Sequence, residues 1–339
     1  MRFLTRNLFK FIKSRSFLLL ILVFTSCSKD YTNEEIEEKE EIVEESYISK
    51  VFEFSPSVGQ FTNVLPKYEV GDTQETMRQK AEDAIKGKNP MGMVSLGGFG
   101  GYIVFGFNHT IENKKGLRDF RVVGNAFWAA GNPNSEASPR GGSSEPGIIM
   151  VSVDENKNGL PDDRWYEIAG SAHNEALKNY EITFYRPSPN KTPIKDENIS
   201  YASDIEYIRW TDNQGNSGYK KKNIYHSQNY FPEWLEDKIT FRGTLLPNNG
   251  VDESGTGSYW VLYSFGYGYV DNAPNNDDAS AIDIDWAVDD AGNRVNLPGI
   301  DFVKVYNGMN QECGWLGETS TEIAGAYDLH SIGITIKSE

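Results

Sequence analysis

The sequence predicts an all-β protein, a β-sandwich or β-barrel, with one short helix. From Tyr47 onward it contains about ten short strand-like runs separated by glycine, asparagine or proline, as in sandwiches and barrels. No helical segments alternate with these runs, which argues against a parallel α/β sheet. We find no internal repeat, which argues against propellers and solenoids.

The first elements are a strand and a helix. Lys50–Phe54 alternates between apolar and polar residues and is followed by Pro56, so it is expected to be a strand. A helix is expected near 73–86, with Asp72 or Thr73 as its N-cap and Gly87 at its end. The later strands are expected at Tyr102–Phe107, Asp119–Gly124, Ile148–Val153, Arg164–Ile168, Tyr180–Tyr185, Lys238–Phe241, Ser258–Phe265, Ala281–Trp286, Ile300–Tyr306 and Ser331–Ile336.

The glycine-rich stretch Ser95–Tyr102 is expected to serve the backbone. Its four glycines permit positive φ angles and close approach between strands. A phosphate-binding loop would be followed by Lys-Ser/Thr and a helix, whereas here a predicted strand follows.

Residues 1–26 have the features of a signal peptide. Five basic residues precede the apolar run Phe17–Phe24, which is too short to span a bilayer. The following Phe24-Thr-Ser-Cys27 resembles a bacterial lipobox, although leucine is usual where Phe24 stands, and this implies lipid attachment at Cys27. The alternative is an ordinary secretory signal with an incidental cysteine. Either interpretation predicts export from the cytoplasm.

Residues 27–46 are expected to be a disordered acidic tether. Positions 30–46 contain nine acids and one base, so like charges repel and little can be buried. The alternative is a short helix, which would be marginal in solution. The stretch also resembles the export signal of Bacteroidota lipoproteins that reach the outer face of the cell.

The charge of the chain limits its partners. Removal of residues 1–26 would take the formal charge from −16 to −21, because five bases would be lost. Such a chain is expected to repel nucleic acid and anionic phospholipid, so membrane attachment would depend on the lipid. Only Cys313 would remain as a free thiol, which excludes an intramolecular disulfide.

Several stretches together resemble a jelly-roll, galactose-binding-like domain of bacterial secreted proteins. The resemblance extends from about 47 to 336 and indicates the surface lipoproteins of gut Bacteroidota loosely called cell-surface or PKD-like proteins. It implies a single jelly-roll β-sandwich over 47–339, with an insertion at about 195–270. The stretches are Gly59–Phe61, Ser95–Phe107, Gly116–Val123, Glu145–Val153, Ile300–Val305 and Trp315–Glu322.

The same resemblance implies a function. Similar proteins are often encoded with TonB-dependent transporters, and some are associated with capture of vitamin B12. We therefore expect a non-catalytic lipoprotein, anchored in the outer membrane and exposed at the cell surface, that passes a corrinoid to a TonB-dependent transporter. A carbohydrate ligand is the first alternative, and a glycoside hydrolase is the second.

The segment 154–163 contains the oxygen ligands of a calcium loop. The spacing of these oxygen-bearing residues matches successive ligand positions of a calcium-binding loop. However, Trp165 stands where such a loop has its bidentate glutamate. The alternative is a β-hairpin with a turn at Asn158-Gly159. The candidate Ca²⁺ ligands are Asp154, Asn156, Asn158, the Leu160 carbonyl, Asp162 and Asp163.

The predicted insertion at about 195–270 is rich in aromatic rings interleaved with amides. Rings can cover the apolar faces of a sugar or corrin while polar atoms fix its orientation. The alternative is that these rings pack within the protein. His226 could also bind a metal, but the sequence lacks paired histidine spacing. The candidate ligand-binding residues are Trp210, Tyr219, Tyr225, His226, Gln228, Tyr230 and Trp234.

A set of acids is the only candidate for catalysis. If Asp283 and Asp285 lie on one face of a strand, a carboxylate pair could hydrolyse a glycosidic bond. The alternative is that the aspartates face water or cap turns. No serine-, cysteine- or zinc-dependent hydrolase motif is present. The acids considered are Asp277, Asp278, Asp283, Asp285, Glu318 and Glu322.

Overall fold

The computed structural model describes residues 44–129 and 140–338. Strands hold 39% of the residues and helices 8%, so the prediction of an all-β protein is confirmed. Cys27, the signal segment and nearly all of the acidic tether lie outside the described residues. Within the described ranges, none of the helices is both long and apolar enough to cross a membrane.

The predicted jelly-roll sandwich is wrong. The described strands form six separate sheets, and the small sheets are arranged as a four-blade β-propeller. Four of the sheets have three or more strands, with six, four, four and three strands respectively. These sheets differ in size and take strands from distant parts of the chain, so the sequence has no regular period. For this reason the absence of an internal repeat did not exclude a propeller.

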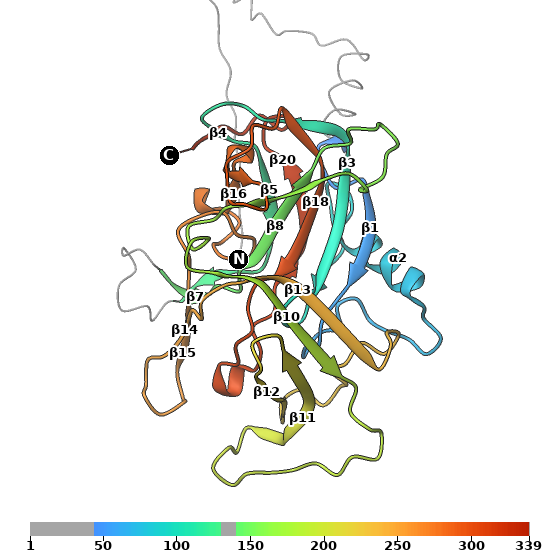
Figure 1. The fold of residues 1–339 in the computed structure, drawn as a ribbon, viewed down its shortest axis with the longest axis vertical. Helices are drawn as coiled ribbons and strands as arrows, with labels where there is room; N and C mark the ends of the chain where they lie inside the picture. The colour runs from blue at the N-terminus through green and yellow to red at the C-terminus, as the bar shows by residue number, and fades with distance from the viewer. Residues whose placement is uncertain (1–43, 130–139, 339) are drawn as a thin grey trace, which may run out of the picture.

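The six-stranded sheet is antiparallel throughout and provides the frame of the molecule (Figure 1). Its central strands β3 and β18 pair over most of their lengths, with Val303 opposite Phe105. Its strands in spatial order are β1 (Lys50–Ser55), β3 (Tyr102–Glu112), β18 (Gly299–Asn307), β8 (Gly147–Ser152), β9 (Trp165–Ile168) and β17 (Ala287–Val288).

The second sheet has four strands and contains much of the predicted aromatic insertion. In Figure 1 its hairpin β11–β12 projects from the end of the molecule opposite the C-terminus. The sheet also includes β10, which precedes the predicted insertion at about 195–270. Its strands in spatial order are β12 (Ser217–Asn223), β11 (Ala202–Asp212), β10 (Leu177–Tyr185) and β13 (Lys238–Leu245).

The remaining strands form smaller sheets. The end of the predicted insertion belongs to one of them, since β14 and β15 pair with each other and β15 also pairs with β7. The four-stranded sheet contains β14 (Gly250–Asp252), β15 (Trp260–Tyr263), β7 (Gly141–Ser143) and β6 (Phe127–Trp128). The three-stranded sheet contains β16 (Ala281–Ile282), β5 (Phe120–Val123) and β20 (Gly325–Asp328). The two-stranded sheets pair β19 (Glu322–Ile323) with β2 (Val94–Ser95), and β21 (Ile336–Lys337) with β4 (Leu117–Arg118).

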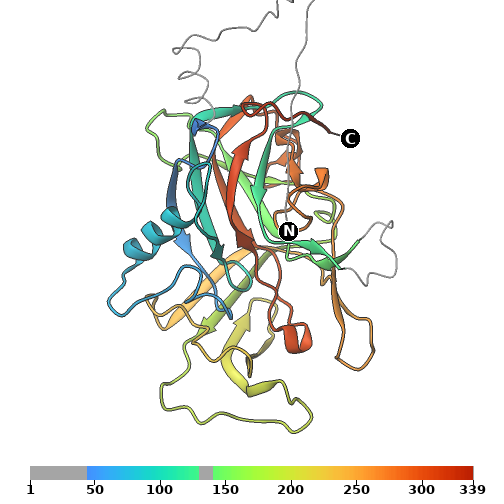
Figure 2. The same ribbon diagram turned by 180° about the vertical axis from the view of Figure 1, so that it is seen from behind.

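The helix predicted at 73–86 is confirmed as α2 (Gln74–Ile85). The Thr73 side chain caps it by accepting a hydrogen bond from the Thr76 amide. Met77, Ala81 and Ile85 are fully buried, and the helix packs beside β1, as seen from behind in Figure 2. The amphipathic spacing therefore predicted both the element and its buried face.

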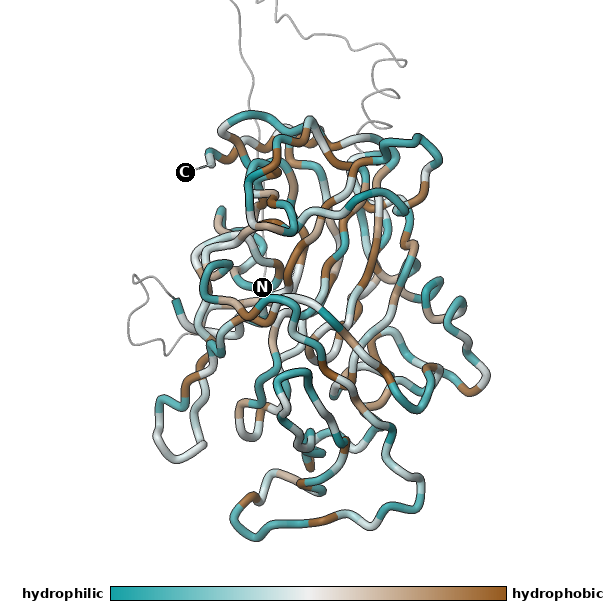
Figure 3. The backbone as a smooth tube through the Cα atoms, in the orientation of Figure 1, coloured by the Kyte–Doolittle hydropathy of each residue, from teal (hydrophilic) through white to brown (hydrophobic). Residues whose placement is uncertain are grey.

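Two apolar clusters position the cleft described below. The main core joins the six-stranded sheet to β5, β20 and α2 and includes Phe105 and Phe120. A second cluster joins the β10–β13 sheet to the glycine-rich segment through Phe99, Phe184 and Phe241. Figure 3 shows hydrophobic residues along the central strands and mainly hydrophilic residues in the loop between β10 and β11.

An ion pair between His109 on β3 and Asp328 on β20 predicts a pH dependence of stability. His109 Nε2 lies 2.8 Å from Asp328 Oδ2, and this hydrogen bond raises the pKa of His109. The folded state therefore binds the proton more tightly than the unfolded state. The contribution to stability is full below the unfolded pKa of about 6.5 and is lost as the pH rises through the higher folded pKa.

We expect His109→Gln to reduce the loss of stability between about pH 6 and pH 8. Urea unfolding of both proteins at several pH values measures this effect. Equal pH slopes for the two proteins would show that the His109–Asp328 pair does not contribute.

Candidate functional site

A cleft of about 810 Å³ lies where β13 and the start of β10 meet β9, β18 and the loop at 289–292. Its volume falls in the range of about 300–1,000 Å³ found for small-molecule sites. The walls combine aromatic rings with charged side chains. The rings and charged groups of these walls include Tyr102, Glu167, Lys178, Arg242, Lys304 and Tyr306.

The carboxylate of Glu167 on β9 is surrounded by donors. Oε1 accepts hydrogen bonds from His173 Nδ1 at 2.9 Å and Lys178 Nζ at 3.0 Å. Oε2 accepts from Thr244 Oγ1 at 2.7 Å and Tyr306 Oη at 3.4 Å. Burial alone would raise the pKa of Glu167, but the donors from His173, Lys178 and Thr244 outweigh it and lower the pKa. Glu167 is therefore a fixed negative charge that holds the wall of the cleft together.

Two cations in the cleft are available to a ligand. Lys304 on β18 and Arg242 on β13 line it, and neither forms an ion pair with any residue in the described ranges. Lys304 Nζ lies 4.2 Å from the centre of the Tyr102 ring, and its burial lowers its pKa. Glu53 attracts Lys304 only from beyond ion-pair distance, so a partly buried cation remains that favours an anionic group in the cleft.

Glu167 and Asp289, two of the three carboxylates that line the cleft, are poorly suited to act as general acids. The pKa of Asp289 is lowered by hydrogen bonds from the Asn293 amide and side chain, and the pKa of Glu167 is also lowered. A general acid needs a raised pKa near the working pH. Neither Glu167 nor Asp289 has that property.

The predicted aromatic binding residues are dispersed. None of them lines the cleft at Glu167, and none lines any of three smaller cavities in the structure. Trp234 stacks between Tyr68 and Phe54 and donates its Nε1 proton to Gln74 Oε1 at 3.0 Å. Tyr230 is 3% exposed. These two rings therefore pack within the protein.

The other predicted residues lie nearer the surface. Trp210 is half-buried against the second apolar cluster, whereas Tyr219 is 40% exposed and Tyr225 67% exposed. His226 packs edge-on against Phe61, and burial lowers its pKa. Gln228 donates from Nε2 to the Gln60 carbonyl. Two tyrosines are thus accessible, but the structure does not gather the set into one pocket.

The calcium-like loop connects β8 and β9, which pair as an antiparallel hairpin. Asp154 accepts from the amides of Asn158 and Gly159, and Asn156 and Asn158 direct their side-chain amides at Asp162. Asn156 also lies 3.4 Å from Asp163, and Leu160 is exposed. The antiparallel pairing of the two strands is confirmed, but the tight turn at Asn158-Gly159 is not, since a long loop joins Ser152 to Trp165 and the positive φ angles are at Lys157 and Gly159. In the described part of the chain, the loop does not bring three carboxylates within 4.8 Å of one another.

The predicted strand at 281–286 is only partly present. Ala281–Ile282 is β16, and Ile284–Trp286 is a short 3-10 helix capped by Asp283, whose side chain accepts from the Asp285 amide. Asp277 likewise caps the 3-10 helix Asp278–Ser280. Asp283 and Asp285 therefore do not share a strand face, and the capping interpretation is confirmed for Asp277 and Asp283.

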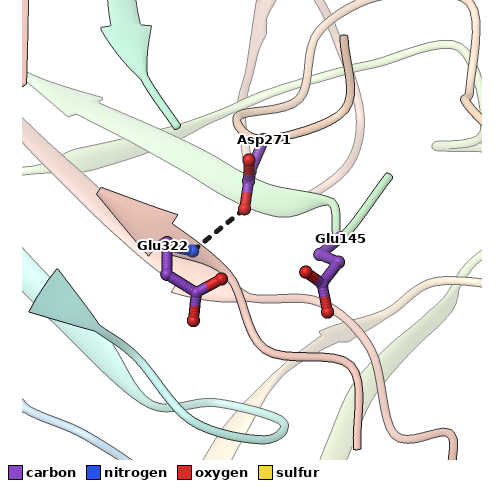
Figure 4. Close-up of side chains that lie close together, drawn as sticks. All are labelled: Glu145, Asp271 and Glu322. Atoms are coloured by element: carbon purple, nitrogen blue, oxygen red, sulfur yellow. Dashed lines mark hydrogen bonds between the residues drawn. The ribbon is translucent and has the colours of Figure 1, made fainter. Parts of the chain in front are cut away.

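A buried acidic triad forms elsewhere, from Glu145, Asp271 and Glu322 (Figure 4). One carboxylate oxygen from each lies within 4.8 Å of the others. Asp271 Oδ1 accepts from the amides of Asn125 and Ala126, both at 2.7 Å, and Oδ2 accepts from the Glu322 amide at 3.0 Å. Burial raises the pKa of Asp271 to about 7, and burial together with the Asp271 charge raises that of Glu322 to about 8.

Sequence reasoning missed the cleft and recognised only part of the triad. Lys304 in the middle of the apolar strand Ile300–Tyr306 was a usable signal, because charge inside such a strand is unusual. Glu322 was considered, but only as one acid in a possible catalytic set. Glu145 and Asp271 come from distant segments that meet when the Glu145 amide donates to the Asp271 carbonyl.

Comparison with known proteins gives no family for this chain. No protein-family model matches it, and no curated protein matches it.

Proposed function

We propose that the chain is a non-catalytic binding protein whose ligand occupies the cleft at Glu167. The observation that carries this proposal is the cleft of about 810 Å³ in which, among the described residues, neither Lys304 nor Arg242 has a carboxylate oxygen within ion-pair distance. A ligand acid could pair with these cations, and Tyr102 and Phe241 could cover an apolar face.

An acidic carbohydrate of one or two sugar units suits the cleft best. Its carboxylate would meet the two cations, and its hydroxyls would meet the polar lining formed by Thr240, Asn174 and Asn179. A whole corrinoid with its nucleotide loop is larger than the drug-sized ligands that such cavities enclose. The cleft therefore supports a glycan over the corrinoid that the resemblance implies.

Delivery to a TonB-dependent transporter and anchoring through Cys27 are parts of the same proposal. The basic, apolar and lipobox-like features of residues 1–27 support the anchor. A surface protein that binds cargo without altering it would serve as the capture step before transport. The lowered pKa values of Glu167 and Asp289 support the non-catalytic role.

A matched ligand panel tests this function by calorimetry. The probes are digalacturonate, the neutral digalactose that lacks its carboxylates, and cyanocobalamin. We expect digalacturonate to bind at least tenfold more tightly than digalactose, because one charge-assisted hydrogen bond contributes about 1.5–3 kcal/mol. Binding of cyanocobalamin alone would support the corrinoid instead, and turnover of an aryl glycoside would contradict the non-catalytic role.

A further inference from the structure

A second, smaller cavity adjoins the acidic triad. It has a volume of about 150 Å³ and is lined by Glu145 and Glu322 of the triad, by the nearby Glu318, and by Gln60. This space is suited to an ion with a few waters and is much smaller than the cleft at Glu167. The cavity is therefore distinct from the cleft of the proposed function.

The triad has a charge that the described protein does not balance. Asp271 is 3% exposed and Glu322 is 5% exposed, while Glu145 is partly buried. None of the three carboxylates forms an ion pair with a lysine, arginine or histidine in the described ranges. Buried charges are normally paired or bound to a metal, because desolvation strongly disfavours an isolated charge. The arrangement therefore requires a cation or protons.

The backbone at Asp271 is also held in an uncommon conformation. Its φ angle is +55°, in the left-handed region that residues other than glycine rarely adopt. Three backbone amides, from Asn125, Ala126 and Glu322, fix its carboxylate. Such strain, maintained by surrounding hydrogen bonds, is characteristic of functional sites.

Gln60 supplies an independent observation. It is 3% exposed and lines the small cavity, and its Oε1 atom has no hydrogen-bond partner within the described part of the chain. Its Nε2 atom donates to the Leu316 carbonyl at 2.8 Å, which fixes the amide group. A buried amide oxygen without a partner is unfavourable unless a ligand or water satisfies it. An amide oxygen is also one of the groups that bind Ca²⁺.

Gly317 makes this position of Gln60 possible. A Cβ atom on Gly317 would lie 2.3 Å from Gln60 Nε2, and Gly317 has a φ angle of +89°. A larger residue there would displace the Gln60 amide from the cavity wall. Gly317 thus lets Gln60 remain in the wall of the cavity that Glu145 and Glu322 also line.

We propose that Glu145, Asp271 and Glu322 bind a calcium ion. The side-chain carbonyl of Gln60, Oε1, is a further ligand from the same cavity. The donors are all oxygen atoms, which selects a hard cation. Ca²⁺ accepts irregular sets of carboxylates and amide carbonyls, whereas Mg²⁺ requires near-ideal octahedral geometry and retains more waters. The ion would connect the segment before β8, the loop at Asp271 and the start of β19, and the site differs from the loop at 154–163.

Thermal unfolding of the full chain, stripped with a chelator and then titrated with CaCl₂ or MgCl₂, tests this site. We expect millimolar Ca²⁺ to raise the Tm by several degrees and Mg²⁺ to raise it less, because a ligand that binds only the folded state stabilises it. Glu322→Gln should abolish the Ca²⁺ shift. The control Asp154→Asn/Asp162→Asn, in the hairpin loop, should retain it.

Glu145→Gln provides a second variant if Glu322→Gln does not fold. Glu145 is partly exposed, and a glutamine oxygen can still accept from the Ser320 amide. Loss of the Ca²⁺ shift in this variant would support the site. No Ca²⁺ shift in the wild type would overturn the proposal and indicate that protons neutralise the triad. A shift lost in the loop variant but kept in the triad variants would assign Ca²⁺ to the hairpin loop.

Discussion

Replacing Gly101 with alanine is expected to lower the free energy of unfolding by on the order of 3–5 kcal/mol. A Cβ atom at this position would lie 1.9 Å from the Leu96 carbonyl oxygen and 2.3 Å from the Ser57 amide nitrogen. These two atoms form a hydrogen bond of 2.9 Å, so the new methyl group would separate them. Because both contacts are with backbone, no side-chain rotation can relieve them.

The effect of Gly101→Ala should extend to the cleft. The Gly101 carbonyl accepts from the Asn307 amide at the end of β18, and Gly100 and Tyr102 line the cleft. Urea unfolding measures the loss, with Gly92→Ala as the control. Gly92 is exposed and would contact only the Ala84 Cβ, at 3.9 Å. A loss below about 1 kcal/mol for Gly101→Ala would contradict the close packing described here.

Phe105→Ala is expected to cost about 3–5 kcal/mol of stability. Phe105 is fully buried on β3, between its partners Val51 on β1 and Val303 on β18. Removing the ring leaves a cavity at the centre of the six-stranded sheet, which the paired strands cannot close. The lost burial and the cavity therefore add together.

A matched aromatic control is Phe127→Ala. Phe127 is 58% exposed on β6, so its replacement should change stability by less than about 1 kcal/mol. Chemical denaturation of both variants gives the comparison. Similar losses for the two would show that the core is not centred on β3.

Local patterns predicted much of the secondary structure. The stripe at Met77, Ala81 and Ile85 predicted α2, and the runs on either side of the loop at 154–163 predicted the pairing of β8 with β9, although not through a tight turn at Asn158-Gly159. The glycines before Tyr102 were correctly assigned a backbone role, with positive φ angles at Gly97 and Gly100. Each of these signals lies within a few residues, where turn and helix geometry directly constrain sequence.

The arrangement of the sheets could not be read from local patterns. β18, near the C-terminus, lies between β3 and β8, and β17 joins the same sheet at its edge. Strand alternation shows which face is buried but not which strand is the neighbour. The jelly-roll resemblance supplied a strand arrangement that the structure contradicts.

Both proposed sites are also products of distant contacts. Lys304 and Arg242 meet across the cleft from strands more than fifty residues apart, and Glu145 is still farther from Asp271 and Glu322 in the sequence. The aromatic residues at 201–234 were numerous enough to suggest a binding surface. Trp234 packs against the main core and Tyr230 lies in the second cluster, so aromatic residues of one segment can instead serve the packing of different parts of the protein.

The affinity of Lys304→Met for digalacturonate, compared with Lys222→Met, tests the proposed binding site most directly. Both lysines are partly buried and lie over tyrosine rings, at 4.2 Å for Lys304 and 4.7 Å for Lys222. Lys304 lines the cleft, whereas Lys222 lies on β12 among the predicted aromatic residues. We expect calorimetry to show a tenfold to hundredfold loss of affinity for Lys304→Met and wild-type affinity for Lys222→Met, at about 1.4 kcal/mol per tenfold change. Wild-type affinity in Lys304→Met, with binding lost in Lys222→Met, would place the ligand on the aromatic segment and contradict the cleft.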